Sequence, residues 1–291
     1  MHDLIKELIK DGPVVTDGAW GTELVSRGLK PGASPELWNL ENPLGVQEVP
    51  AAYIAAGSRI VLTNTFGGNR FIQKKFAQEG KIGEINRAGV EISKKAASAS
   101  GTLVFASMGP SGKVLMMKDV TEAELQAAFE EQAQALTEAG ADALVIETMA
   151  EMTEAIIAIK AARQTGLPVI GCMTFDSGKA KDRTMMGDRV SSVVKRFEDA
   201  GVDVIGSNCG QGIEGFVNIC RQMREATALP LWIKANAGLP RFIDGETVFT
   251  STPEEFASTV PVLIEAGANF IGGCCGTSPA FIEAVARVLK R

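Results

Sequence analysis

A pattern that occurs four times along the chain limits its fold more than any other feature. Each copy reads as the end of a helix, an Ala-Gly turn and a short apolar strand. The copies are AAGSRIVLTNTFGG from Ala55, EAGADALVIETM from Glu138, DAGVDVIGSNCG from Asp199 and EAGANFIGGCCG from Glu265. Helices that lead into strands again and again indicate a repeated α/β unit.

Further apolar runs between turn signals bring the expected strands to eight; they start at Pro13, Thr102, Leu167 and Leu229. Amphipathic stretches of helical period lie between the strands. Among them are Thr121–Ala139, where Thr121 and Glu124 form a capping box, and Thr252–Glu265. Near-continuous apolar strands suit a parallel sheet that helices cover on both faces. We therefore predict a TIM (β/α)8 barrel, with a doubly wound open sheet as the alternative.

The length of 291 residues fits one large barrel as well as two ordinary domains. The eight α/β units favour a single barrel domain over residues 1–291. Two stretches, Arg27–Glu48 and Phe175–Arg189, are the least regular and read as loops. The second follows the fifth expected strand, at the end of the barrel where such folds carry their chemistry.

Charge and cysteine content exclude several classes of protein. The net charge is -6 and no basic run occurs, which argues against a nucleic-acid partner. The N-terminal stretch lacks the apolar core of a secretory signal, and no apolar run is long enough to span a bilayer. Five cysteines are an odd number and too few for a disulfide scaffold, as is typical of a reducing compartment. We therefore expect a soluble cytoplasmic protein.

Equivalent positions in the four copies carry polar residues. The seventh residues after Gly57, Gly140, Gly201 and Gly267 are Asn64, Glu147, Asn208 and Cys274, and the eighth are Thr65, Thr148, Cys209 and Cys275. If the units are structurally equivalent, all eight residues lie at the carboxyl ends of parallel strands, the rim where barrels build active sites. Cysteines far apart in sequence then become neighbours.

Three thiolates and one open position describe a zinc site that holds an exchangeable ligand. Adjacent residues of a regular strand point to opposite faces, so Cys274 and Cys275 share a metal only where the strand breaks down. Three glycines permit that break: Gly272, Gly273 and Gly276. Burial as small residues, a vicinal disulfide or chance would also produce a Cys-Cys pair, and the register of Cys209 favours zinc. Cys172 and Cys220 lie in apolar stretches and read as core thiols.

Other expected rim residues suit charged groups of a ligand. Asp17 ends the first strand at a glycine-rich turn, where backbone N–H groups from Gly18 and Ala19 to Thr22 suit a carboxylate or phosphate; capping of the turn is the alternative. Glu147 closes the apolar run ALVIE and suits an ammonium group, with capping of the next helix as the alternative. Asn236 follows the seventh strand and either lines the same mouth or forms a turn.

A set of motifs resembles the homocysteine S-methyltransferase family from about Asp11 to Arg291: DGAWGTEL, TNTFGGN, ETM, MTFD, NCG, NAG and GGCCGTSP. The family includes betaine–homocysteine methyltransferase and the homocysteine-binding module of cobalamin-dependent methionine synthase. LTNTFGGN and ANAGLP are similar to segments of the latter module. KANAG replaces the usual proline-containing segment, which puts the contact from the seventh strand in doubt.

The resemblance implies a TIM barrel with zinc held by Cys209, Cys274 and Cys275 and the sulfur of L-homocysteine as the fourth ligand. It also implies amino-acid recognition through Glu147 and the turn at Asp17. The expected substrate-binding set is Asp17, Gly18, Ala19, Thr65, Glu147, Asn208 and Asn236. Zinc ionises a thiol for attack on a methyl group and makes a catalytic base unnecessary, in agreement with a lone histidine at position 2.

Two methyl donors fit such a site. Because no segment is left over for a cobalamin-binding module, one donor is methylcobalamin on a separate corrinoid protein. The other is a small sulfonium or ammonium compound, which would favour an aromatic cage. The chain is poor in aromatic residues, with rim candidates Trp20, Trp38, Phe66 and Phe175, so we favour the corrinoid protein. The acceptor is homocysteine or another thiol.

A hypothesis of another class is a non-catalytic, zinc-stabilised barrel that binds a thiol. A structural zinc site would have a fourth protein ligand, and no further cysteine lies in the rim register.

Overall fold

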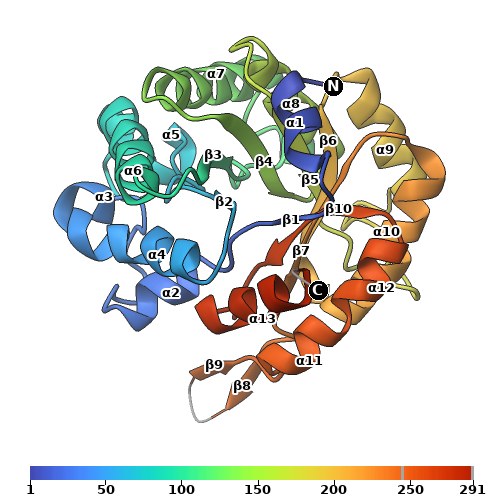
Figure 1. Cartoon of the computed structure of the whole chain (residues 1–291). Helices are drawn as coiled ribbons and strands as arrows, with labels where there is room; N and C mark the ends of the chain where they lie inside the picture. Colours follow the sequence, from blue (N-terminus) through green and yellow to red (C-terminus); the bar gives the residue numbers. More distant parts are fainter. Residues whose placement is uncertain (244–245, 290–291) are drawn as a thin grey trace.

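Eight parallel strands follow one another around a central barrel, and helices surround them (Figure 1). The computed structural model describes residues 1–243 and 246–289. The barrel strands are β1 (Val14–Val15), β2 (Ile60–Val61), β3 (Leu103–Met108), β4 (Ala143–Met149), β5 (Val169–Met173), β6 (Val204–Gly212), β7 (Leu231–Asn236) and β10 (Ala268–Gly273). Their order in the sheet is β1-β10-β7-β6-β5-β4-β3-β2, so each barrel strand from β3 onward pairs with the barrel strand that precedes it in the chain, and β10 also pairs with β1. The predicted TIM barrel is therefore confirmed, and the doubly wound alternative is wrong.

The barrel is nearly closed between β1 and β2. The backbone N–H of Arg59 donates to the carbonyl oxygen of Val15 at 2.9 Å. The hydroxyl of Ser58 donates to the backbone carbonyl oxygen of Thr16 at 3.2 Å. These bonds join the first two strands of the sequence, so that the strand ends form a ring.

Thirteen α-helices occur in the described residues: α1 (Asp3–Ile9), α2 (Gly21–Ser26), α3 (Trp38–Glu41), α4 (Pro43–Ala55), α5 (Arg70–Lys74), α6 (Ile82–Ala97), α7 (Glu122–Glu138), α8 (Met152–Arg163), α9 (Val190–Asp199), α10 (Ile213–Ala226), α11 (Pro253–Ser258), α12 (Val260–Glu265) and α13 (Pro279–Leu289). The capping box of Thr121 and Glu124 at the start of α7 is confirmed. None of the described helices combines the length and the apolar character that a membrane crossing needs.

The Ala-Gly turns of the repeated pattern form as predicted. Helices α4, α7, α9 and α12 each end two residues before the glycine of their copy. The φ angles of these glycines are +105°, +90°, +85° and +105° for Gly57, Gly140, Gly201 and Gly267. Only glycine adopts this left-handed conformation without strain, so the four turns share one backbone path from helix to strand.

Some predicted element boundaries are wrong. The expected helix Thr252–Glu265 is two helices, α11 and α12, because Pro261 cannot donate a hydrogen bond to the preceding turn. The expected loop Arg27–Glu48 contains α3 and the start of α4. By contrast, the stretch Phe175–Arg189 holds no helix and only isolated bridges such as Ser177 to Arg183.

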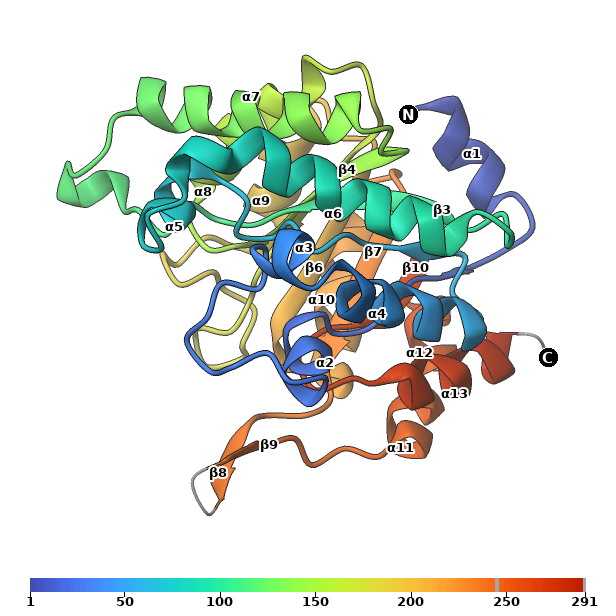
Figure 2. The same cartoon turned by 90° about the vertical axis from the view of Figure 1, so that its left-hand side faces the viewer.

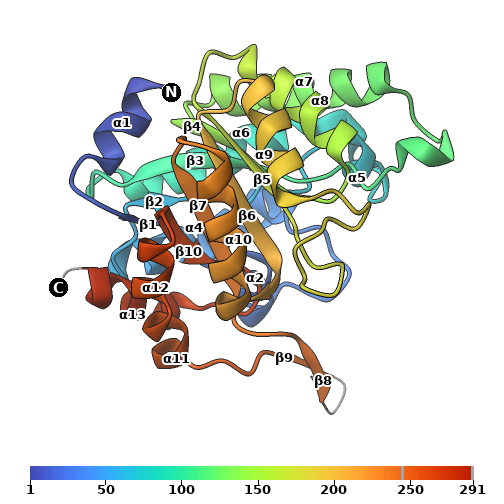
Figure 3. The same ribbon diagram turned by 90° about the vertical axis from the view of Figure 1, so that its right-hand side faces the viewer.

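A small hairpin, β8 (Arg241–Ile243) and β9 (Glu246–Val248), follows β7 and was not predicted. Its strands stand away from the barrel (Figures 1 and 2). In the two side views, α1 lies at one end of the barrel, and the connections that follow β3 and β5 lie at the other (Figures 2 and 3).

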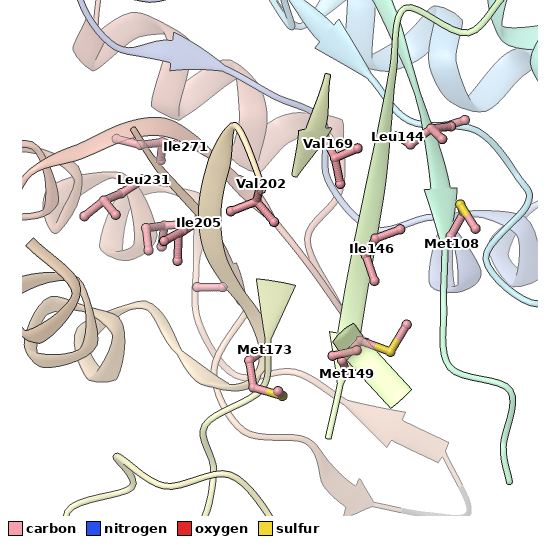
Figure 4. Packing of buried hydrophobic residues seen from close by; sticks show 14 of the residues in the cluster. Met108, Leu144, Ile146, Met149, Val169, Met173, Val202, Ile205, Leu231 and Ile271 are labelled. Atoms are coloured by element: carbon pink, nitrogen blue, oxygen red, sulfur yellow. The ribbon is translucent and has the colours of Figure 1, made fainter. Parts of the chain in front are cut away.

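The core has two layers. The barrel interior is filled by buried side chains that include Phe105, Trp232 and Phe270, with Ile5 of α1 packed against them. A second layer lies between strands and helices; Figure 4 shows part of it, including Ile146. Both thiols predicted to be in the core are fully buried, Cys172 inside the barrel and Cys220 in the outer layer.

Candidate metal and substrate site

The carboxyl ends of the strands surround a cavity of about 390 Å³. Its wall includes these predicted site residues: Gly18, Ala19, Glu147, Cys209, Cys274 and Cys275. Four other predicted residues are buried and do not belong to the wall: Asp17, Thr65, Asn208 and Asn236. The rim register therefore brings the predicted residues to one place, in two shells around the cavity.

The three rim cysteines form a compact group. Their sulfur atoms all lie within 4.8 Å of one another, and the sulfurs of Cys209 and Cys275 are 4.0 Å apart. Two sulfurs bound to one tetrahedral zinc ion at about 2.3 Å each would lie about 3.8 Å apart. Across residues 1–243 and 246–289, the group contains no fourth Cys, His, Asp or Glu. The donor set therefore fits a zinc ion with one open position.

Breaks in two strands turn the three thiols toward each other. Cys209 has a left-handed backbone, with φ of +61°, inside an irregular stretch of the β6–β7 pairing. Strand β10 ends at Gly273, so Cys274 and Cys275 lie outside the regular strand, and Gly276 continues with φ of +80°. Strand alternation is thereby lost at the places where neighbouring residues have to face one cavity.

The Cys-Cys turn is fixed by hydrogen bonds to its surroundings. The hydroxyl of Thr277 donates to the carbonyl oxygen of Cys274 at 2.7 Å and accepts from the backbone N–H of Ala19 at 3.1 Å. The N–H of Ala237 donates to the carbonyl oxygen of Cys275 at 3.0 Å. Three segments of the sequence therefore hold the thiol pair in place.

Asn208 connects the thiol group to the end of β4. Its side-chain oxygen accepts from the backbone N–H of Thr148 at 2.8 Å, and its amide donates to the hydroxyl of Thr148 at 2.7 Å. The same amide lies 3.8 Å from the sulfur of Cys274. Thr148 has φ of +59°, so this clamp stabilises a backbone conformation that a non-glycine residue rarely adopts.

Interactions within the group shift the pKa values of the three thiols in opposite directions. Hydrogen bonds from Cys274 and Cys275 to the sulfur of Cys209 lower the pKa of Cys209 to about 3. The same interaction with Cys209 raises the pKa of Cys275 to about 11, and the pKa of Cys274 also rises. Full ionisation of the group needs a bound cation, which again fits a metal site.

Glu147 presents a buried carboxylate to the cavity. Burial raises its pKa above the usual value, and the charge of Lys234 opposes that rise. The hydroxyl of Ser107 donates to one oxygen, and the amide of Asn208 lies 3.5 Å from the other. The second oxygen keeps acceptor capacity for a cationic group.

Lys234 is a site residue that the sequence interpretation missed. It lies on β7, lines the cavity and forms an ion pair with Oδ1 of Asp17. Burial lowers the pKa of its ammonium group, but the charges of Asp17 and Glu147 outweigh burial and raise that pKa. A lysine inside the apolar run LPLWIKANAG was the available signal, because a buried ammonium group needs a partner.

Two of the four aromatic rim candidates line the cavity. Trp20 and Phe66 line the cavity, whereas Phe175 is buried and Trp38 is not part of the wall. Among the described residues, the other side chains that line the cavity are not aromatic.

Comparison with known proteins places these features in a family. The family model described as homocysteine S-methyltransferase matches residues 14–289. A methionine synthase of Mycobacterium tuberculosis is 28% identical over 300 residues, which cover 96% of this chain and 25% of the relative. A methionine synthase of Mycobacterium leprae is 28% identical over 305 residues, 98% of this chain and 25% of the relative. The chain thus spans about a quarter of the length of these curated relatives.

Solved structures agree on the fold. The metallated form of the homocysteine methyltransferase MmuM from Escherichia coli is 24% identical, with a TM-score of 0.79 and 98% of both chains covered. The oxidized form of the same protein gives a TM-score of 0.81 at 24% identity, with 97% of this chain and 98% of that chain covered.

Proposed function

Because this chain belongs to the homocysteine S-methyltransferase family, we propose that it is a zinc-dependent S-methyltransferase that methylates L-homocysteine to methionine. The observation that carries the proposal is the group of three cysteine sulfurs on the cavity wall. That group has no fourth Cys, His, Asp or Glu in the part of the chain that the structure describes, so a substrate thiol can take the open position.

In this proposal Cys209, Cys274 and Cys275 hold the ion. When bound, zinc supplies the Lewis acidity that keeps a thiol ionised at neutral pH. The acceptor sulfur attacks the methyl carbon, and the carbon–sulfur bond forms as the bond from donor to methyl breaks. The electron pair of that bond leaves with the donor, and the thiol proton goes to solvent. No side chain has to act as a base.

The wall residues receive the amino-acid part of the acceptor. We assign the ammonium group to Glu147, whose second oxygen keeps acceptor capacity. We assign the carboxylate to backbone N–H groups of the turn Gly18–Thr22, which lines the cavity; the N–H of Ala19 already donates to Thr277. Asn208 orients Glu147 and Thr148 from behind the wall, and we place Thr65 and Asn236 in the same supporting role.

A separate corrinoid protein that carries methylcobalamin is our proposed donor. Exposed apolar side chains lie on the connections after β3, β5 and β7, at the end of the barrel that holds the cavity: Met116, Met117, Met185, Met186 and Leu239. Exposed apolar groups, methionines above all, favour contact with a macromolecule. All five cysteines are free thiols, which supports our placement of the protein in the reducing cytoplasm.

The zinc content and the zinc-edge X-ray absorption of the reduced protein test the acceptor chemistry. We expect one zinc per chain with three sulfur ligands, and a fourth sulfur after addition of L-homocysteine. A coordination shell that homocysteine does not change contradicts the proposal.

Methionine formation with two donors tests the partner. We expect turnover with a methylcobalamin-loaded corrinoid protein and none with free S-methylmethionine. Replacement of Met116 and Met117 by Ser should raise KM for the corrinoid protein and leave the affinity for homocysteine unchanged. Val262→Ser, on the outer helix α12, is the matched control. Turnover with the free sulfonium compound would overturn the choice of donor.

A further inference from the structure

Lys234 occupies a position that the proposed function leaves unexplained. Its side chain is only 2% exposed, yet it lines the cavity and pairs with Oδ1 of Asp17. Oδ2 of Asp17 accepts hydrogen bonds from the backbone N–H of Leu62 at 2.7 Å and from Nε1 of Trp20 at 2.8 Å. Both oxygens of Asp17 are therefore engaged, and the carboxylate is held in a fixed orientation.

We infer that the pairing of Asp17 with Lys234 sets acceptor specificity: Asp17 holds the ammonium group of Lys234 away from Glu147, which is left to bind the single ammonium group of an amino-acid thiol. The inference rests on the proposed function and names the feature of its substrate that the pocket selects.

Three charged groups meet at this side of the cavity. Asp17 follows β1, Glu147 lies on β4 and Lys234 lies on β7, and the charges of both carboxylates act on the ammonium group. In a buried site, a carboxylate that already faces a cation has little attraction left for a second one. The carboxylate that does not pair with Lys234 is therefore the one that remains to bind the substrate ammonium group.

The contacts show that Lys234 pairs with Asp17. The ion pair of Lys234 is with Asp17, and Leu62 and Trp20 fix the same carboxylate from its other oxygen. On Glu147, by contrast, Ser107 donates to one oxygen, and the other has only the amide of Asn208 at 3.5 Å, so it keeps acceptor capacity.

Glu36 also lines the cavity, but both of its oxygens already accept hydrogen bonds. The backbone N–H of Gly67 donates to one at 2.8 Å, and Ser34 and Gln73 donate to the other at 3.0 and 3.3 Å. Glu147 is thus the carboxylate of the wall that is placed for a substrate cation.

A pair of ligands measures this selection directly. Homocysteine and 4-mercaptobutanoate share the thiol and the carboxylate, and only homocysteine has the amine. We would titrate each into the zinc-loaded protein by calorimetry and compare the two dissociation constants. The wild-type protein should prefer homocysteine by about tenfold or more, which corresponds to about 1.4 kcal/mol.

Three variants test the pairing of Asp17 with Lys234. Asp17→Asn frees Lys234 to face Glu147, so the preference for homocysteine should fall to about one. The double variant Asp17→Asn with Lys234→Gln removes both charges, leaves Glu147 alone again and should restore the wild-type preference. A purely structural role for Lys234 predicts no such rescue. Lys234→Gln alone should retain the preference for the amine.

Several results would overturn the inference. An Asp17→Asn protein with the wild-type preference, or a double variant without it, contradicts the proposed pairing. If Lys234→Gln raises the dissociation constants of both ligands by the same factor, Lys234 binds the substrate carboxylate. Since a single variant leaves a buried charge unpaired and can unfold, thermal unfolding and zinc content are measured for each, and the neutral double variant then decides. A wild-type protein that binds neither ligand contradicts the proposed function itself.

Discussion

Cys275 is the residue whose replacement best separates a catalytic zinc from a structural one. Cys275→Ser removes one of three sulfurs at a partly exposed position. We expect a folded protein with a wild-type far-UV spectrum, less than one zinc per chain and no methyl transfer, because the barrel core does not depend on the metal. Cys220→Ser, in the outer core layer, is the control that should keep its zinc.

Loss of folding in Cys275→Ser, reversed by added zinc, would instead support the non-catalytic, zinc-stabilised barrel.

Glu147→Gln separates substrate binding from stability. The variant keeps the acceptor for Ser107 and loses the charge, so KM for homocysteine should rise about tenfold or more. Burial raises the pKa of Glu147 in the folded protein above its ordinary value of 4.5, so the wild type loses stability as pH rises from that value through the folded pKa. The variant should therefore melt at a higher temperature than the wild type at neutral pH, and the difference should disappear in acid.

The exposed Glu138→Gln is the control for both measurements and should change neither KM nor the melting temperature. An unchanged KM for homocysteine in Glu147→Gln would show that Glu147 does not bind the substrate ammonium group.

Residue positions were predictable where the pattern repeats and not where charges pair. Cys209 and Cys274 share a cavity because they follow turns of the same geometry, so counting from the glycines was sufficient. Lys234 belongs to no repeated position, and its pairing with Asp17 depends on two strands that are far apart in sequence. Single-residue patterns do not report such long-range pairs.

At the scale of elements, the four helix-to-strand turns depend on a left-handed glycine. Gly140→Ala places a β-carbon at φ of +90° with no atom within 4 Å of it, so only the backbone conformation is strained. We expect the free energy of unfolding to fall by about 1–2 kcal/mol in urea denaturation. Gly83→Ala, in helix α6 and also without a neighbour within 4 Å, should leave stability unchanged or raise it by less than about 1 kcal/mol. Equal effects of the two changes would disprove the left-handed turn.

Elements were predictable in type and less so at their ends. The strands and their glycine turns followed from alternation of apolar runs and caps. The left-handed conformations of Thr148 and Cys209 were not foreseeable, because only side-chain contacts such as the Asn208 clamp make them stable. Pro261 was a signal that Thr252–Glu265 forms two helices. The amphipathic period continues across this proline, so a single helix was predicted.

For the whole molecule, we propose that the barrel unfolds as a single domain over residues 1–291. Helix α1 packs Ile5 against the barrel interior, so a change at the N-terminus should affect the entire fold. Ile5→Ala should cost about 2–5 kcal/mol, with one cooperative transition by both fluorescence and circular dichroism. The exposed Glu7→Ala should stay within about 0.5 kcal/mol of the wild type. Two separate transitions would contradict a single domain.

The architecture was predictable because eight similar units leave few alternatives, and the sheet order confirms it. The β8–β9 hairpin was not, since an insertion after one strand interrupts the repeat without changing the barrel. Its residues also lack the alternating apolar pattern of a core strand.

The filled interior of the barrel has a consequence for the order of events. Phe105, Trp232 and Phe270 fill the barrel interior, so we expect ligands to reach and leave the cysteines by the mouth that a donor protein would cover. Homocysteine would then have to arrive first, and methionine could depart only after the donor withdraws. Initial-rate kinetics should accordingly show a compulsory sequence, in which the acceptor is the leading substrate and the methylated amino acid competes with it alone.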